Sequence, residues 1–409
     1  MKILYAAGDF PAEPLNGCHW FAYNLINCMA RSHECHLISL AMPGRAACVR
    51  EWERCLPGLR VLDVLPVRHR QLVRWSKGAN YITNLRIPHL VQWMTPGFTR
   101  ALRRVVRETS YDLVHFTDIT LVFYRNLVRG SPVVISGPDP ASLHLRGNMP
   151  FEPSFAKRVK LATTARAYGN IERTHLKTFS AVHVVSEADA EHLRRSAGLK
   201  NVTVINHAVD PRFFAVPIEA CGDEDAVTMF SSGSFSVPYI RTPFMSFFER
   251  HWDAIRRCRP AARWVVAGPG APADVKKRLT AAPGVEYHEW IHDYDGALFR
   301  SDIAVFLDGS GTGMKTRVLQ AMGAGKAVVG TPFAFTGLEV KHGVQGFIAD
   351  GHDSLMRALV ALIESPRLRR EIGGAAREHV RARFTLEITG RKWDALYERM
   401  LRQHRDTRL

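Results

Sequence analysis

The sequence predicts an α/β protein of two domains, each built on a parallel sheet. Residues 303–332 run strand, glycine turn, helix and strand, and this βαβ order is typical of a parallel sheet. The same alternation opens the chain and restarts after a linker at 215–225. A chain of 409 residues is long enough for two domains of ordinary size.

Composition is that of a globular protein, with 46% hydrophobic and 23% charged residues. No apolar run reaches the roughly 18 residues of a membrane span, and the apolar start MKILYAAGDF is too short for a signal peptide. Seven cysteines without a C-x-x-C pair indicate reduced thiols and a cytoplasmic protein. The net charge of +16 fits either a basic face for an anionic partner or an ordinary solvated surface.

The N-terminal half begins with a strand at 3–7, a loop, a helix at 20–30 and a strand at 36–40. The loop ends at Asn16-Gly17, immediately before the helix. Residues 50–108 then interleave arginines with aromatic residues. Such a pattern on helices fits an anionic membrane surface or a polyanion such as nucleic acid, and no recognisable nucleic-acid motif accompanies it.

Two further strands are expected at 111–116 and 132–136. Ligands of open α/β sheets bind at the carboxyl ends of strands, so His115, Asp118 and Asp139 are candidates for contact with a substrate. The alternative for each is a polar side chain that makes local hydrogen bonds at a strand end.

In the C-terminal half, strands are expected at 227–230, 264–266 and 285–287, with a helix at 244–257. The stretch GSGTGMKTRVLQAMGAGKAVVGTP follows the apolar run 303–307. Gly311 and Gly313 let a ligand approach the backbone, the next helix offers unpaired amides, and Lys315 and Arg317 add positive charge. These features predict a diphosphate-binding turn.

Two alternatives remain for this turn. Glycines before a helix can simply make a tight connection. GTGMKT is also close to a nucleoside-triphosphate P-loop, but Met314 displaces Lys315 by one residue and argues against that motif. Helical patterns then fill 350–384 and 386–401, and the last has Trp393, Leu396, Tyr397 and Met400 at core spacing.

The motifs resemble those of the GT4 family of retaining GT-B glycosyltransferases. Its members carry a glycine turn, a basic residue, a Leu-Glu-Ala-Met helix and a Gly-x-Pro-Val-Val strand, and this chain reads Leu319-Gln320-Ala321-Met322 and then Gly325-Lys326-Ala327-Val328-Val329. The segments IERTHLKTFSAVHVVSEADAEHL, from 171, and INHAVDPRFF, 205–214, resemble the family's central signatures.

The resemblance implies a GT-B fold, with two Rossmann-like α/β/α domains facing across a cleft. The expected parts are an N-terminal acceptor-side domain at 1–207, a nucleotide-sugar-binding domain at 208–385, and a C-terminal helix at 386–409 that crosses back to the first domain. The implied activity is glycosyl transfer from a nucleotide sugar, with retention and without a metal.

The resemblance also implies roles for individual residues. Gly17 matches the second glycine of the family's Gly-Gly loop, and Asn16 stands in place of the first. Asp139 and His115 are the candidates that orient sugar or acceptor. The expected donor-binding residues are Gly233, Arg241, Gly311, Gly313, Lys315, Thr316, Arg317 and Gln320.

The resemblance further implies no cofactor beyond a UDP- or GDP-linked sugar. The acceptor is expected to be a glycan, a lipid-linked molecule or a small molecule. Peripheral contact with the inner face of an anionic membrane is a hypothesis, and nucleic acid is not an expected partner.

The chain departs from the family at two acidic positions. Gln320 replaces the glutamate that holds the donor ribose, and Thr312 stands where many members have a second glutamate. Gln320 can still accept a hydrogen bond but brings no charge. The alternative function is therefore a non-catalytic GT-B binding or scaffold protein.

Overall fold

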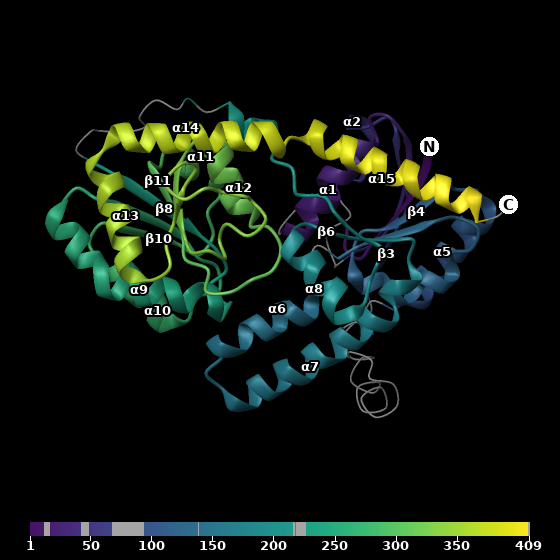
Figure 1. The fold of residues 1–409 in the computed structure, drawn as a ribbon, viewed down its shortest axis with the longest axis horizontal. Coiled ribbons are helices and arrows are strands. Elements are labelled where there is room, and N and C mark those ends of the chain that lie inside the picture. The colour runs from purple at the N-terminus through teal and green to yellow at the C-terminus, as the bar shows by residue number, and fades with distance from the viewer. Residues whose placement is uncertain are drawn as a thin grey trace. The chain divides into compact units, whose positions relative to one another are not determined.

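The computed structural model describes residues 1–11, 17–41, 49–67, 94–137, 139–215, 217 and 226–407. These residues form two compact units (Figure 1). Unit 1 comprises Met1–Arg146, Lys160–Ala208 and Leu386–Leu409, and unit 2 comprises Gly147–Val159 and Val209–Thr385. The predicted N-terminal domain, 1–207, therefore contains one segment, 147–159, that packs with unit 2.

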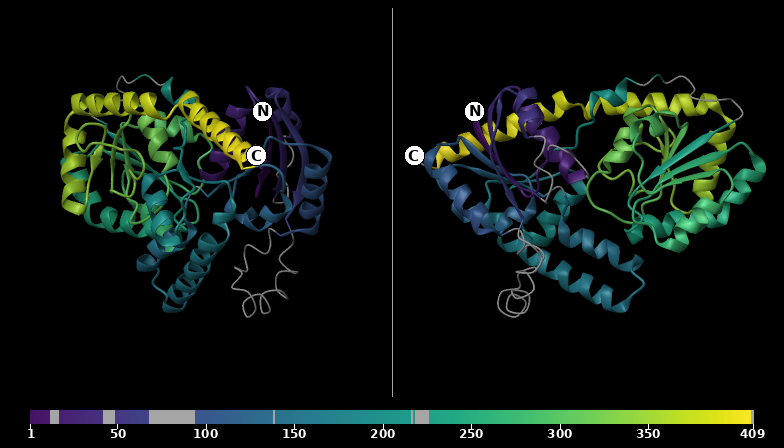
Figure 2. Two further views of the ribbon diagram at one scale, coloured as in Figure 1. Left: turned by 45° about the vertical axis from the view of Figure 1, so that its right-hand side comes forward. Right: turned by 180° about the vertical axis from the view of Figure 1, so that it is seen from behind.

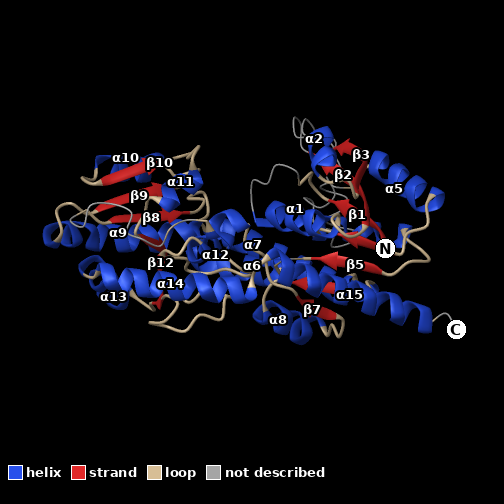
Figure 3. Ribbon diagram, turned by 90° about the horizontal axis from the view of Figure 1, so that it is seen from above, coloured by secondary structure: helices blue, strands red, loops and turns tan. Residues whose placement is uncertain are grey.

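Unit 1 is built on a parallel sheet of seven strands among the described residues, in the order β3-β2-β1-β4-β5-β6-β7. The strands are β1 (Lys2–Ala7), β2 (Glu34–Ala41), β3 (Leu59–Pro66), β4 (Leu113–Phe116), β5 (Val133–Ser136), β6 (Ala181–Val184) and β7 (Val202–Val204). Its helices are α1 (Gly17–Met29), α2 (Val49–Cys55), α5 (Pro96–Glu108), α6 (Ala141–Asn148), α7 (Phe155–Thr174), α8 (Glu187–Ala197) and α15 (Leu386–Asp406), with α7 starting in unit 2 (Figure 3).

Both faces of this sheet are covered, which is why its strands read as continuous apolar runs. Leu4 and Phe116 belong to the hydrophobic cluster on one face, and Ile3 and Tyr5 belong to the cluster on the other. Successive residues of β1 thus point to opposite faces. The second cluster includes Trp393, so α15 completes unit 1 and packs against α1, as the family resemblance implies for the last helix.

Unit 2 is built on a second sheet, drawn in teal and green in Figure 2. Its described strands are parallel and have the order β10-β9-β8-β11-β12-β13. The strands are β8 (Thr228–Ser232), β9 (Arg263–Ala267), β10 (Val285–His288), β11 (Ile303–Phe306), β12 (Ala327–Gly330) and β13 (Phe347–Ile348). The helices are α9 (Pro238–Cys258), α10 (Ala273–Ala281), α11 (Tyr294–Phe299), α12 (Thr316–Gly323), α13 (His352–Glu364) and α14 (Pro366–Arg383).

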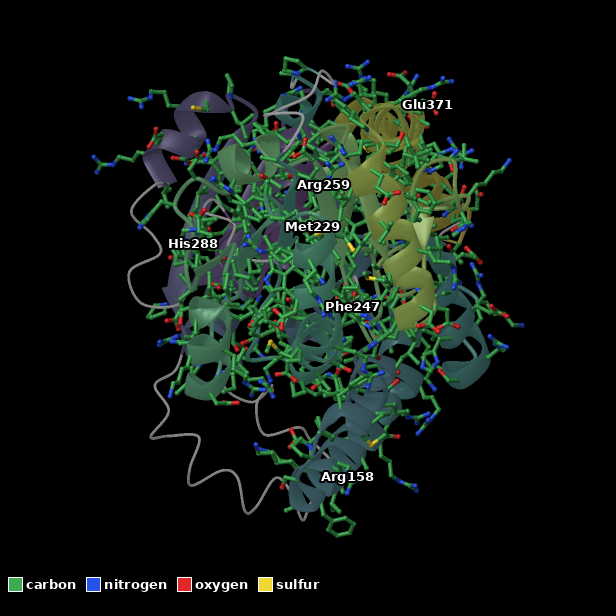
Figure 4. The ribbon with its side chains drawn as sticks, turned by 90° about the vertical axis from the view of Figure 1, so that its left-hand side faces the viewer. Arg158, Met229, Phe247, Arg259, His288 and Glu371 are labelled. Atoms are coloured by element: carbon green, nitrogen blue, oxygen red, sulfur yellow. The ribbon has the colours of Figure 1, made fainter. Side chains whose placement is uncertain are left out.

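The core of unit 2 is rich in aromatic residues from α9 packed on β9. Trp264 is fully buried and contacts Phe244, Phe247 and Phe248. Met229 of β8 belongs to the same core, and it is labelled with Phe247 in Figure 4. This core fixes α9 and the sheet, and so supports the loops at the carboxyl ends of β8 and β11.

Two parallel sheets with helices confirm the predicted α/β fold class with Rossmann-like domains. Some bounds differ from the expected ones, and the helix predicted from Phe244 begins six residues earlier, at Pro238. Proline fits the first turn of a helix, where its missing N–H has no partner to lose. None of the described helices is long and apolar enough to cross a membrane.

Candidate functional site

The glycine-rich turn connects the end of β11 to the start of α12, as predicted. Its backbone has a φ of 144° at Gly311 and 68° at Gly313. These values lie in the region that favours glycine, because a side chain there is strained. The turn therefore depends on glycine at both positions and brings the chain to the N-terminus of α12, where the first amides have no partner within the helix.

Lys315 lies against this turn instead of extending from it. The side chain is buried, and Nζ donates a 2.6 Å hydrogen bond to the Thr312 carbonyl. A Cβ atom added at Gly311 would lie 2.7 Å from Nζ, so Gly311 leaves the space that the ammonium occupies. The positive charge of Lys315 is thus fixed directly over the glycine turn.

Arg317 forms an ion pair with Asp308, which follows β11. The side chain of Asp308 is 1% exposed and that of Arg317 is 20% exposed. Burial alone would lower the pKa of Arg317, but the Asp308 carboxylate outweighs it and the pKa is raised. The Asp308 Oδ2 and Arg317 Nε atoms have no hydrogen-bond partner among the described residues, so the pair keeps hydrogen-bonding capacity.

Gly233, at the end of β8, lies beside the same guanidinium. A Cβ atom added at Gly233 would lie 3.8 Å from Cζ of Arg317. The ring of Phe306 lies below the guanidinium, with 5.7 Å from Cζ to its centroid. The structure therefore brings together three predicted residues, Gly233, Lys315 and Arg317, around the carboxyl ends of β8 and β11.

Arg241, the predicted basic residue after β8, makes a hydrogen bond within unit 2. Its Nη1 donates a 2.7 Å hydrogen bond to the carbonyl of Phe235, in the loop that follows Gly233. Arg241 thus ties this loop to the first turn of α9. Its part in donor binding stays a prediction.

The remaining donor-site candidates lie on α12. Thr316 is the first residue of the helix and Gln320 lies one turn later, and both are half-buried. Thr312, in the place of the family's other glutamate, is buried within the glycine turn. Their contacts with a donor stay predictions.

The candidates of unit 1 lie on different elements of that unit. Asn16 lies outside the described residues, and Gly17 is the first residue of α1. Asp139 is half-buried between β5 and α6. Its place after a strand agrees with the expected strand-end position, and its role stays a prediction.

His115 lies inside the core of unit 1 and has no exposed surface. Its Nδ1 lies 2.6 Å from the Tyr397 hydroxyl and its Nε2 lies 2.7 Å from the Ser136 hydroxyl. Burial, and secondarily His183, hold its pKa well below the usual range, so the ring is neutral. Both nitrogens already have partners, and this placement favours the local hydrogen-bonding alternative over the expected contact with sugar or acceptor.

His183 fixes the direction of this buried network. Its Nε2 donates to the Ile205 carbonyl over 2.8 Å, because a carbonyl only accepts. Burial lowers its pKa to about 3, so Nδ1 is unprotonated and accepts from Ser136 over 3.0 Å. Ser136 then accepts from His115 Nε2, and His115 Nδ1 accepts from Tyr397.

Sequence patterns miss Asp308, Tyr239 and Tyr294 near the glycine turn. Asp308 ends the apolar run of β11, so the strand-end rule could have found it. The backbone carbonyl of Tyr239 accepts a hydrogen bond from Gly309 N–H over 2.8 Å. The Tyr294 hydroxyl lies 3.1 Å from that of Ser232, and no local pattern marks either tyrosine.

Two family models match this chain. The model described as "Glycosyl transferase 4-like domain" matches residues 16–207, and the model "Glycosyl transferases group 1" matches residues 233–365. The chain belongs to the group 1 glycosyltransferases. The resemblance to this family and the predicted enzyme class, a glycosyltransferase, are therefore confirmed.

A curated relative is an uncharacterised glycosyltransferase of Methanocaldococcus jannaschii. It is 27% identical over 103 residues. The match covers 25% of this chain and spans 26% of the relative, about a quarter of its length.

Solved structures of other glycosyltransferases share the fold of this group 1 protein. Sucrose-phosphate synthase from Thermosynechococcus elongatus aligns with a TM-score of 0.76 at 15% identity over 98% of this chain and 100% of its own. HepE from Anabaena, solved with UDP and glucose, aligns with a TM-score of 0.65 at 16% identity over 97% and 98%. A point mutant of TarM from S. aureus, solved with UDP among its ligands, aligns with a TM-score of 0.69 at 10% identity. That alignment covers 97% of this chain and 100% of the TarM chain.

Proposed function

We propose that this chain transfers a glycosyl group from a nucleoside diphosphate sugar to a glycan, a lipid-linked molecule or a small-molecule acceptor. One observation carries the proposal. The glycine turn, the buried Lys315 and the Arg317 side chain meet at the N-terminus of α12 in a member of a glycosyltransferase family. This arrangement has the donors and the charge that a diphosphate requires.

In the proposed complex, the diphosphate lies on the first-turn amides of α12. The backbone amides of Thr316 and Arg317 face the helix N-terminus, where the helix dipole favours an anion. The Arg317 guanidinium donates to phosphate oxygens through its planar fork. Asp308 holds this guanidinium in place before the donor arrives, so little side-chain entropy is lost on binding.

The proposed reaction exchanges one bond to the anomeric carbon for another. The bond from the anomeric carbon to the diphosphate oxygen breaks, a bond from the acceptor hydroxyl oxygen forms with net retention, and the hydroxyl proton passes to the leaving diphosphate. Lys315 and Arg317 offset the charge that develops on the leaving group. On this proposal the reaction requires no metal ion, and Asp139 is the remaining candidate for orienting the sugar or acceptor.

The first donor to test is a UDP sugar. HepE and TarM were solved with UDP, and GDP sugars are the other class that the family resemblance implies. Gln320 is proposed to accept a hydrogen bond from the donor ribose. Because it is uncharged, we expect weaker ribose binding than a glutamate would give.

The experiment is a calorimetric titration of the protein with UDP, GDP, ADP and TDP. We expect one nucleotide to bind, and Arg317→Ala to weaken that binding by at least about tenfold. Arg367→Ala is the matched control, since this exposed arginine pairs with Glu371 on α14. Absence of binding by all four nucleotides would contradict the proposed donor site.

A non-catalytic binding protein remains the second candidate, because Gln320 and Thr312 replace acidic residues of the family. Release of UDP from UDP-glucose, measured alone and with simple glycoside acceptors, separates the two. Turnover supports the enzyme, while tight UDP binding without turnover on any acceptor or donor supports the binding protein.

Cytoplasmic residence and peripheral membrane contact stay predictions. The arginine-rich stretch on which the membrane hypothesis depends lies largely at 68–93, outside the described residues.

A further inference from the structure

Helix α7 begins with a segment that packs in unit 2 next to the glycine turn. The short 3-10 helix Met149–Phe151 precedes it, and Phe151 lies against Gly309 and Pro243. A Cβ atom added at Gly309 would lie 2.5 Å from Cζ of Phe151 and 2.7 Å from Cγ of Pro243. Phe151 therefore anchors the start of α7 close to the candidate donor site.

Beyond this anchor, the first turn and a half of α7 has no cover among the described residues. All six residues from Phe155 to Lys160 are exposed. The side chain of Phe155 is 74% exposed and that of Val159 is 48% exposed. Residues four apart lie on one face of a helix, so Phe155 and Val159 form a single apolar patch.

Positive charge surrounds this patch. Lys157, Arg158 and Lys160 are exposed, and the sequence contains no acidic residue from 155 to 171. Arg158 is labelled at the outer end of α7 in Figure 4, and its Cζ lies 6.0 Å from the centre of the Phe155 ring. Lys157 lies 3.9 Å from Glu152, whose side chain is 12% exposed, so part of its charge is offset. Two cations, Arg158 and Lys160, remain without an acid within their own turn of helix.

We propose that the N-terminal end of α7, residues Phe155–Lys160, docks on an anionic lipid bilayer. Phe155 and Val159 enter the boundary between headgroups and acyl chains, and Arg158 and Lys160 bind the lipid phosphates. An aromatic and an aliphatic side chain flanked by basic residues have the chemistry of an interfacial helix. The surface is distinct from the arginine-rich stretch before residue 108.

A protein partner fits this surface less well. Interfaces between proteins are depleted of lysine, and a stable interface buries about 800 Å² on each partner. Two apolar side chains ringed by lysine and arginine supply neither feature. A bilayer requires no shape complementarity, and its headgroups match the sign of the charge.

Docking through α7 would place the Phe151 anchor, and with it Gly309, near the lipid surface. This consequence rests on the proposed function, and it favours a lipid-linked acceptor over a soluble one. The docking itself does not depend on catalysis.

The test is flotation with vesicles of phosphatidylcholine alone and with 30% phosphatidylglycerol, at low and high salt. We expect the full chain to bind only the anionic vesicles and to be released by salt, since exposed charges are screened. A Phe155→Ser/Val159→Ser variant and an Arg158→Glu/Lys160→Glu variant should each bind at least about tenfold more weakly. The matched controls are Phe333→Ser/Val344→Ser, which replaces apolar side chains of 44% and 48% exposure, and Lys200→Glu.

The far-ultraviolet spectrum and UDP titration verify that each variant is folded. Equal vesicle binding by the α7 variants and the wild type would overturn the proposal, as would equal binding to neutral vesicles. The proposal would also be overturned if the wild type did not bind vesicles and the Phe155→Ser/Val159→Ser variant differed from it in oligomeric state. That result would assign the patch to self-association. Loss of vesicle binding by the α7 variants, with UDP affinity unchanged, supports the docking surface whether or not the protein catalyses glycosyl transfer.

Discussion

Replacing Arg317 by methionine tests the charge arrangement of the glycine turn. The substitution keeps an unbranched side chain about as long as the stem of arginine and removes the guanidinium, which is the partner of Asp308; the Asp308 side chain is 1% exposed. Breaking a buried ion pair by removing one partner costs about 3–5 kcal/mol, because the other charge stays buried without compensation. Arg317 itself is 20% exposed, so solvent reaches the pair from one side and we expect the lower end of this range.

Protonation of the orphaned carboxyl sets a ceiling on that cost. A free aspartic acid has a pKa of about 3.9, so protonating it at pH 7 costs about 4 kcal/mol, and at pH 5 about 1.5 kcal/mol. The destabilisation of Arg317→Met should therefore be about 3–4 kcal/mol at pH 7 and shrink to at most about 1.5 kcal/mol at pH 5. Arg317→Met/Asp308→Leu removes the buried charge and should recover most of the loss.

Urea unfolding of the wild type and both variants at pH 7 and pH 5 measures these differences. UDP titration of the same proteins measures their affinity for the nucleotide, and we expect both variants to lose donor binding. A destabilisation below about 1 kcal/mol at pH 7, or one that does not change with pH, would refute the buried-pair reasoning. Unchanged UDP affinity in a folded variant would refute the role of Arg317 in the donor site.

Four further predictions follow from the same contacts. Gly311→Ala should destabilise the protein by about 1–3 kcal/mol and weaken UDP binding, because φ is 144° there. The control is Gly374→Ala in helix α14, where nothing lies within 4 Å of the added Cβ. Measured by urea unfolding, this control should be neutral or slightly more stable. Burial lowers the pKa of His183 to about 3, so the stability that this neutral ring contributes is complete above about pH 6.5 and falls as the pH drops toward 3. At pH 5 the loss should be about 2 kcal/mol in urea unfolding. Burial also holds the pKa of His115 well below its usual range, so its contribution falls in the same direction. Gln320→Glu should change the affinity for UDP, measured by titration. Transfer activity should survive excess EDTA, measured as UDP release.

Each of these has an outcome that contradicts it. Equal stability of the Gly311→Ala and Gly374→Ala variants would mean that the turn relaxes at no cost. A flat stability curve between pH 7 and pH 5 would mean that the two histidines are already charged or not buried. Unchanged affinity in Gln320→Glu argues against contact with the ribose, and activity lost with EDTA and restored by a divalent ion would contradict the metal-independent reaction.

Local pattern predicted the elements of this fold well. The apolar run 303–307 became β11, the glycines became a turn with positive φ, and the apolar spacing of Trp393 and Tyr397 became the buried face of α15. These features depend on neighbours within a few residues, and periodicity reports them directly.

Sequence patterns did not predict which side chains contact one another. Arg317 was recognised as a cation at the turn, but its pairing with Asp308 depends on a rotamer across the turn. His115 follows the strand-end rule, yet Tyr397, 282 residues later in the chain, fills the space beside it. The sequence alone therefore could not decide whether this histidine faces a substrate or lies in the core.

Unit 1 is discontinuous in the chain, and this affects the order in which the protein matures on the ribosome. The hydroxyl of Tyr5 lies 3.2 Å from that of Tyr397, 392 residues later. At about 5–20 residues per second, synthesis separates the two tyrosines by roughly 20–80 seconds. During that interval the apolar face of the first sheet lacks the cover of α15, because the last segment of unit 2, which ends at Thr385, must be synthesised before that helix. The domain synthesised first is thus the last to be completed, and a nascent chain stopped before residue 386 would present that face to chaperones.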